Sequence, residues 1–331
     1  MRKINRRGLR RTAATVTAGA IVMAGGALAA SAATAQAAPL SHSAATTYRF
    51  TTLDNANDPT FNQLLGINNE GVIAGYFGSG AAGHPNKGYQ LFPRYGQRNY
   101  VNENFPGSVQ TQVTGLNDRD VTVGFWSSMN NANQVNDNFG FWEKNGKFHN
   151  ANFPTGDAGS PPVDQLLGVN DGNVAVGFWT DAAGNNHGYT VNLNKDKFSS
   201  VTDPNAPSAS LQATAINNYG QIAGVYTNPG TGVTDGFLKT GGKFTDLAVP
   251  GATATMALGV NDHDEVVGVY MVAGGDLHGF TWTARGGFKT IDDPQGQGMT
   301  TINGVNDAGD LVGFYVDSVG NTDGMLITPQ R

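Results

Sequence analysis

The stretch GINNEGVIAGYF, residues 66–77, decides the fold because close copies of it recur along the chain. It reads as a β-hairpin, since apolar residues rich in Val and Ile flank a turn that opens with amide or acidic residues. Six copies at a regular period predict a repeat architecture. The other five are GLNDRDVTVGFW from Gly115, GVNDGNVAVGFW from Gly168, AINNYGQIAGVY from Ala215, GVNDHDEVVGVY from Gly259 and GVNDAGDLVGFY from Gly304.

The turns of these hairpins share two features. An Asn opens each turn, and it recurs every 44 to 53 residues, a period that suits one four-stranded propeller blade. Three residues later stands Gly, Asn or Asp, the residues that best tolerate a positive φ angle. We therefore predict a left-handed residue at Gly71, Asp120, Asn173, Gly220, Asp264 and Gly309.

Two further strands are predicted in each repeat. The third begins after a variable loop, at a Gly followed in most copies by Phe or Tyr, as in Gly88-Tyr89. The fourth follows a short turn and stops at a proline, which cannot donate to a strand ladder, as in GKFTDLAVP at 242–250. Each repeat is therefore a four-stranded unit.

The two ends of the array predict that it closes. The last repeat stops after its third strand, at residues 324–331, whereas residues 47–58, TYRFTTLDNAND, match the fourth-strand pattern and precede the first repeat. An N-terminal strand that completes the last blade explains both facts and leaves no open edge. We predict an all-β, six-bladed β-propeller of four-stranded blades over residues 48–331. The alternative, a seventh degenerate blade within 117–170, lacks room.

The first residues read as an export signal. Residues 1–37 combine a basic start, an Ala/Gly/Val-rich stretch and the small-x-small pattern Ala35-Gln36-Ala37. The pair Arg6-Arg7 resembles a twin-arginine signal. An uncleaved membrane anchor is the alternative, but the many Ala, Thr and Gly and the cleavage pattern favour removal. Residues 38–47 are then a short linker, and we expect a secreted, extracellular protein.

Charge and composition narrow the classes of partner. Six of the 20 basic residues lie in the predicted signal, so the mature chain keeps 14 against 26 acidic residues, a net charge of −12. A surface of that sign repels nucleic acid and anionic lipid. The absence of Cys rules out disulfides, thiolate metal sites and cysteine catalysis. We expect a monomer that binds neither nucleic acid nor, once the signal is removed, a membrane.

The repeat resembles a known family. The hairpin pattern, the His/Asp-Gly-Phe start of the third strand and the Asp-x-Pro ending are similar to bacterial extracellular HAF-type repeats, with His187-Gly188-Tyr189 and His278-Gly279-Phe280 closest to the family's tripeptide. The resemblance covers essentially the whole mature chain. It implies an exported repeat protein of mostly unassigned role, and it carries over no catalytic residue.

One aromatic position recurs in every repeat, two residues after the glycine of the second strand. We take these residues as the candidate binding residues, since exposed rings stack on the apolar faces of sugars. Packing between neighbouring blades is the alternative, and the identical use of the position in all six repeats favours it. The residues are Phe77, Trp126, Trp179, Tyr226, Tyr270 and Tyr315.

Signals for metal binding and catalysis are weak. Asp118, Asp171, Asp262 and Asp307 share one turn position and offer the oxygen ligands that suit Ca²⁺, but turn formation already explains them. Asp181–Asn185 and 317–321 fit hairpin turns equally well. No nucleophile elbow, zinc-protease helix or phosphate loop is present, so no cofactor is expected.

The sequence leaves three functions open. The first is a secreted, non-catalytic propeller that binds an extracellular carbohydrate or cell-surface polymer, which the polar loops and export signal favour. The second is an exported polysaccharide-active enzyme, a lyase or glycoside hydrolase, whose carboxylates would come from different blades. The third is a scaffold or self-association module.

Overall fold

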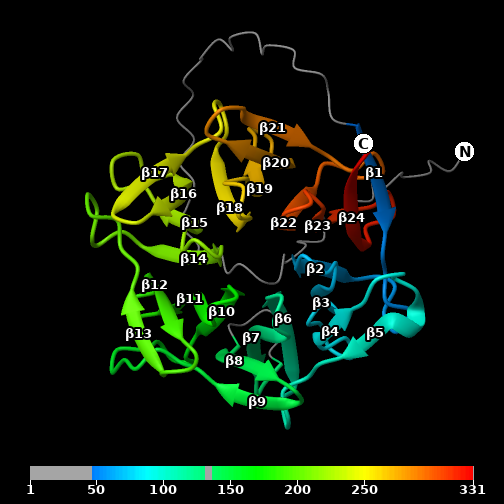
Figure 1. The fold of residues 1–331 in the computed structure, drawn as a ribbon, viewed down its shortest axis with the longest axis horizontal. Coiled ribbons are helices and arrows are strands. Elements are labelled where there is room, and N and C mark those ends of the chain that lie inside the picture. The colour runs from blue at the N-terminus through cyan, green and yellow to red at the C-terminus, as the bar shows by residue number, and fades with distance from the viewer. Residues whose placement is uncertain (1–46, 131–135, 331) are drawn as a thin grey trace, which may run out of the picture.

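The computed structural model describes residues 47–130 and 136–330, which form six four-stranded antiparallel sheets arranged around one axis (Figure 1). The predicted signal and most of the linker lie outside the described residues. The predicted all-β six-bladed propeller is confirmed. None of the helices in the described ranges is long and apolar enough to cross a membrane.

The closing blade joins the two ends of the chain. Its order is β1-β24-β23-β22, and β1 (Thr47–Thr52) pairs antiparallel with β24 (Thr322–Gln330), Thr47 opposite Gln330. Beyond β1, the Asp54 carboxylate accepts the Gly324 N–H at 3.0 Å. The Asn104 side chain accepts the Gly88 N–H in the same way within the first blade. The closing blade is therefore built like the others, as the sequence predicted.

The first three blades follow β1 along the chain, each ordered from the axis outward. A short 3₁₀ helix, η1 (Gln97–Asn99), precedes the outer strand of the first. Their strands are β2 (Asn62–Ile67), β3 (Ile73–Phe77), β4 (Lys87–Leu91) and β5 (Tyr100–Asn102); β6 (Gln110–Leu116), β7 (Val121–Ser127), β8 (Phe139–Lys144) and β9 (Lys147–Asn150); and β10 (Asp164–Val169), β11 (Val174–Thr180), β12 (Asn186–Asn192) and β13 (Lys197–Ser200).

The remaining blades repeat this order, and β1 serves as the outer strand of the sixth. Their strands are β14 (Leu211–Ile216), β15 (Ile222–Thr227), β16 (Thr234–Thr240) and β17 (Lys243–Leu247); β18 (Ala254–Val260), β19 (Val266–Met271), β20 (Leu277–Thr283) and β21 (Gly287–Ile291); and β22 (Thr300–Val305) and β23 (Leu311–Val316), followed by β24.

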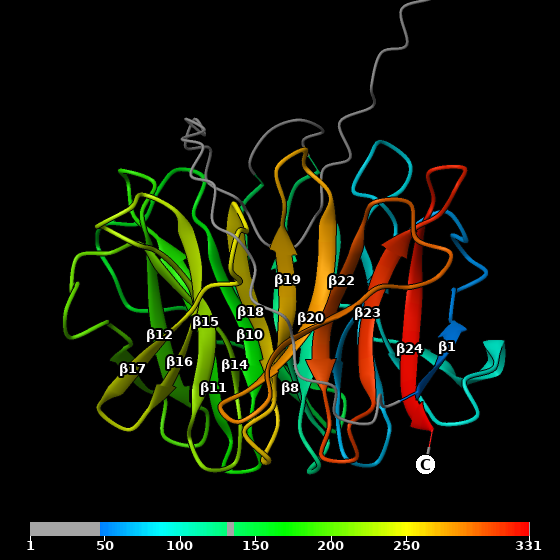
Figure 2. The ribbon, with the colours of Figure 1, turned by 90° about the horizontal axis from the view of Figure 1, so that it is seen from above.

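Alternating strand directions give the molecule two unlike faces (Figure 2). We call the face that carries the Asn turns between first and second strands the turn face. The opposite face carries the loops between second and third strands, such as 181–185, and the linkers between blades, such as 292–299; we call it the loop face. Every linker and variable loop therefore meets on one side of the ring.

A bulge in each first strand explains the glycine of each second strand. In the third blade the register slips between Leu166 and Gly168. The slip brings the Gln165 carbonyl so close to β11 that a Cβ on Gly177 would lie 2.0 Å from it. Only glycine fits this approach. The same contact recurs in all six blades.

Candidate functional site

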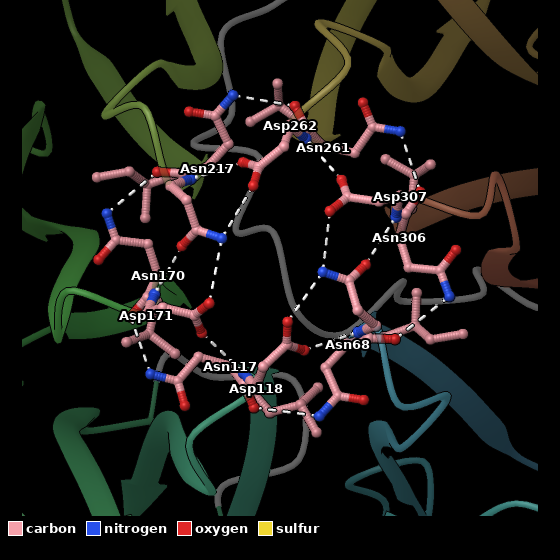
Figure 3. A pocket seen from close by; sticks show the side chains of 18 residues that line it. Asn68, Asn117, Asp118, Asn170, Asp171, Asn217, Asn261, Asp262, Asn306 and Asp307 are labelled. Carbon is pink, nitrogen blue, oxygen red and sulfur yellow. Dashed lines mark hydrogen bonds between the residues drawn. The ribbon is translucent and has the colours of Figure 1, made fainter.

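Six buried asparagines link the blades around the axis at the turn face (Figure 3). The Asn68 Oδ1 accepts the backbone N–H groups of Glu70 and Val72, as an Asx turn requires. The Asn68 Nδ2 donates to the Asn117 carbonyl of the next blade, at 3.1 Å. Equivalent bonds pass from blade to blade until Asn306 donates back to the Asn68 carbonyl, through Asn117, Asn170, Asn217 and Asn261.

The residue after each asparagine forms a second ring. The backbone N–H of Asn69 donates to Asp118 Oδ1 at 2.8 Å, and the last such bond runs from Asp307 to Asn69. The Asn69 amide also bridges the Oδ2 atoms of Asp118 and Asp307, and on the far side of the ring Asn218 bridges those of Asp171 and Asp262. Each of these two side-chain amides therefore bridges one pair of the four carboxylates.

These rings surround an axial cavity of about 80 Å³ lined by the Asn and Asp side chains. Within the described ranges, no group of three or more His, Cys, Asp and Glu side chains is arranged to hold a metal ion. The oxygens of Asp118 and Asp307 instead accept hydrogen bonds from neighbouring blades. The rings act as a clasp that fixes the blades to one another.

The predicted left-handed turn residues lie at the outer side of this clasp. All six have positive φ angles, from 56° at Asn173 to 81° at Gly309. The backbone N–H of Gly71 also donates to the Asn68 carbonyl. The turn prediction is therefore confirmed, and the Asp181 and Asp317 hairpin turns close as expected, each through a bond from the Asp N–H to the carbonyl of Asn185 or Asn321.

The six candidate aromatics lie at the loop-face end of each second strand. Tyr226 and Tyr315 are buried, whereas Phe77, Trp126, Trp179 and Tyr270 are half-buried. Four of the six donate or share a hydrogen bond with the outer strand of their own blade. The pairs are Trp126 Nε1 with Asn150, Tyr226 OH with Asp246, Tyr270 OH with Thr290, and Tyr315 OH with Thr52.

The two tryptophans among the candidate aromatics, Trp126 and Trp179, each contact two other rings. Trp126 stacks on Phe105 at 4.6 Å between ring centroids and also contacts Phe139. Trp179 stacks on Phe153 at 5.8 Å and on His187 at 4.4 Å. Each of these two tryptophans therefore contacts one ring from a linker and one from the third strand. In the third blade the exposed member of the stack is the third-strand residue, His187.

His187 forms the outermost layer in the third blade. It pairs directly with Trp179 across the two strands, and its side chain is 45% exposed. Its Nε2 lies 2.9 Å from Asp181 Oδ2. That hydrogen bond, together with N–H groups of the Asp181 turn, lowers the pKa of Asp181 to about 2. The carboxylate accepts a hydrogen bond from the Nε2–H, which leaves Nδ1 without a partner among the described residues.

Three carboxyl groups elsewhere, in separate blades, are buried (Glu103 and Asp164) or half-buried (Asp54). Burial raises the pKa of Asp54, Glu103 and Asp164 to about 7 in each case. Each is hydrogen-bonded to its surroundings: Asp164 accepts from the Tyr189 hydroxyl and the Phe153 N–H. These carboxyls do not converge on the axial cavity, whose lining has no His or Tyr.

Comparison with known proteins supports the fold alone. No protein-family model and no curated protein matches the chain. Among solved structures it is similar to TolB from Acinetobacter baumannii, with 12% identity and a TM-score of 0.50, covering 78% of this chain and 64% of TolB. It therefore spans less than two thirds of TolB. It is also similar to the SapL1 lectin bound to alpha methyl fucoside, with 9% identity, a TM-score of 0.50, and coverage of 77% and 88%.

Proposed function

We propose that this protein is an exported, non-catalytic propeller that binds a carbohydrate of the cell exterior at its loop face. The observation that carries the proposal is the stack of Trp179, His187 and Asp181. Export rests on the signal-like residues 1–37, and membership of the HAF-type repeats, proposed on the hairpin pattern, agrees with it. The ring fold supplies a rigid support for such loops.

The stack has the chemistry of a sugar contact. Trp179 beneath and Asp181 beside it hold the imidazole in one orientation. The free Nδ1 of His187 forms a hydrogen bond with a hydroxyl, which can both donate and accept, and the exposed ring face packs against sugar C–H groups. Nearby carboxylates and the net charge of −12 in the mature chain favour a neutral sugar over an acidic one.

The candidate aromatics enter this proposal in two ways. The half-buried Phe77, Trp126, Trp179 and Tyr270 border the loop face and support its contacts through their edges and neighbours. The buried Tyr226 and Tyr315 act through the packing and hydrogen bonds of their blades. We therefore place the direct sugar contact on His187, which Trp179 and Asp181 support, rather than on an exposed aromatic ring.

A printed array of neutral, basic and acidic glycans tests the proposal with protein collected from culture medium. We expect retention on neutral glycans, with about tenfold weaker retention for His187→Ala, the loss of one good polar contact. His149→Ala is the matched control, because His149 also stacks on a tryptophan, Trp142, at 4.1 Å but on the outer strands. Folded wild-type protein that is retained by no glycan would refute the function, and its absence from the medium would refute export.

A further inference from the structure

The pairing of a histidine with a carboxylate recurs on alternate blades of the loop face. We propose that the first, third and fifth blades each carry one equivalent sugar contact, so that the protein binds a neutral polysaccharide through three points at once. This inference rests on the proposed function and adds its valency and ligand class. The three pairs are His84 with Asp58, His187 with Asp181, and His278 with Asp292.

The three pairs share one kind of contact, made through Nδ1 of His84 and His278 but through Nε2 of His187. A ring nitrogen lies 2.7, 2.9 or 2.8 Å from a carboxylate oxygen, in the order of the blades. The histidine side chains are 56%, 45% and 29% exposed in the same order. In each pair the carboxylate accepts one ring N–H, so the second ring nitrogen is left for a further hydrogen bond. Each blade of the set thus offers a sugar hydroxyl one remaining ring nitrogen, which is Nε2 in the first and fifth blades and Nδ1 in the third.

Different parts of the chain build these pairs. His187 and His278 occupy equivalent positions, opposite Trp179 and Tyr270. Asp181 nevertheless comes from the hairpin loop of its own blade, whereas Asp292 comes from the linker that follows the fifth blade. If the pairs had arisen only by duplication of one repeat, the carboxylate would occupy the same position in each copy. The convergence of unlike segments on one pairing therefore points to a function beyond the repeat itself.

The first blade forms its pair from a third combination of segments. Its third-strand position, opposite Phe77, holds Lys87, and the histidine lies three residues earlier in the loop. There His84 meets Asp58, which comes from the linker that precedes the blade. The intervening blades have Phe139, Asp235 and Asp323 at the third-strand position and no such pair among the described residues.

The placement suits a ligand with repeated units. Alternate blades of a six-bladed ring are roughly one third of a turn apart, so a single small sugar reaches one pair only. A polysaccharide engages a second pair at a high effective concentration once the first is bound, which raises overall affinity by about 10²–10⁴ without any new contact. The acidic mature chain favours a neutral polymer.

An array of neutral oligosaccharides of glucose, galactose, mannose and N-acetylglucosamine, printed at graded densities, tests this valency. The variants are His84→Ala, His187→Ala and His278→Ala, singly and together. Two matched controls are His149→Ala, on an outer strand, and His263→Ala, on the turn face, where His263 lies 3.8 Å from Asp307. Thermal melting verifies that each variant is folded. We expect all of them to fold, because the three histidine side chains are partly exposed.

We expect wild-type retention to rise steeply with density, each single variant to lose about tenfold at high density, and the triple variant to lose retention throughout. The controls should match the wild type. If His187→Ala alone abolishes retention while the other two variants match the wild type, the trivalent proposal falls and the proposed function stands. If all variants match the wild type, the proposal also falls. If folded wild-type protein binds at no density, both fall.

Discussion

At the scale of single residues, the clasp explains why the hairpin turn reads Asn followed by Asn or Asp. The first position needs an amide, because its Nδ2 donates to the next blade while its Oδ1 closes the turn. The second position needs only an oxygen that accepts a backbone N–H, so either residue serves. The sequence predicted the turn from these residues, but the bonds between blades depend on the closed ring and were not foreseen.

This difference gives a matched pair of substitutions at adjacent residues. Asn117→Asp removes the donor to the Asn170 carbonyl and places a charge at a buried site, so we expect it to lower the free energy of unfolding by about 1–3 kcal/mol. Asp118→Asn keeps an acceptor for the Asn69 N–H and removes one clustered carboxylate; it loses only the exposed bond from the Asn69 side-chain amide, so its effect should be smaller. Urea denaturation compares them, and a larger loss for Asp118→Asn would contradict the clasp.

A second residue-scale prediction concerns unpartnered glutamines. In the first blade the Tyr76 hydroxyl donates to Gln63 Oε1 at 2.8 Å. In the third, Phe178 stands opposite Gln165, whose buried Oε1 has no partner within the described ranges. Phe178→Tyr should restore the bond and raise the free energy of unfolding by about 1 kcal/mol. Tyr76→Phe should lower it by a similar amount, and a Phe178→Tyr variant less stable than wild type in urea would argue against this.

At the scale of elements, the recurrent aromatic ties the outer strand to its blade. The sequence identified the position and favoured packing over binding; in the structure Tyr226 and Tyr315 are buried and the other four aromatics are half-buried. The stacks on Phe105 and Phe153 were not predicted, because these partners lie in linkers whose course is set by the neighbouring blade. The histidine pairs escaped prediction for the same reason, since Asp58 and Asp292 are also linker residues.

The closing strand gives an element-scale test. Tyr315 shares a hydrogen bond with Thr52 of β1, so Tyr315→Phe should loosen β1 by about 1 kcal/mol, roughly a fivefold faster amide exchange. Tyr226→Phe is the control, since Tyr226 bonds Asp246 of β17 and should leave β1 unchanged. Hydrogen exchange measured by mass spectrometry resolves the two strands. Equal exchange of β1 in both variants would contradict the role of Tyr315.

At the scale of the whole molecule, the sequence predicted the number of blades, the four strands of each and the closure at the ends. The structure places the start of β1 at Thr47, one residue before the expected domain boundary. Closure was predictable because a missing outer strand and an extra one are visible in the sequence. The histidine–carboxylate pairs of the loop face were not predicted, because Asp58 and Asp292 lie in linkers and the Asp181 turn was explained by hairpin formation alone.

The buried carboxyls predict how stability varies with pH. Asp54, Glu103 and Asp164 have a pKa raised to about 7, above the value of about 4 expected in the unfolded chain. Between these values the folded state binds more protons, so stability falls as pH rises from about 4 to 7. Calorimetry should show a midpoint roughly a few degrees higher at pH 5 than at pH 8. A higher midpoint at pH 8 would contradict this assignment.

The central claim, that a closed ring presents three histidine contacts on one face, is tested most directly by NMR spectra of the imidazole groups. The described fold has five histidines, of which His149 and His263 lie away from the loop face. During titration with the neutral oligosaccharide best retained on the array, we predict that the signals of His84, His187 and His278 shift and the other two do not. Shifts confined to His149 or His263, or to a single histidine of the loop face, would contradict the claim.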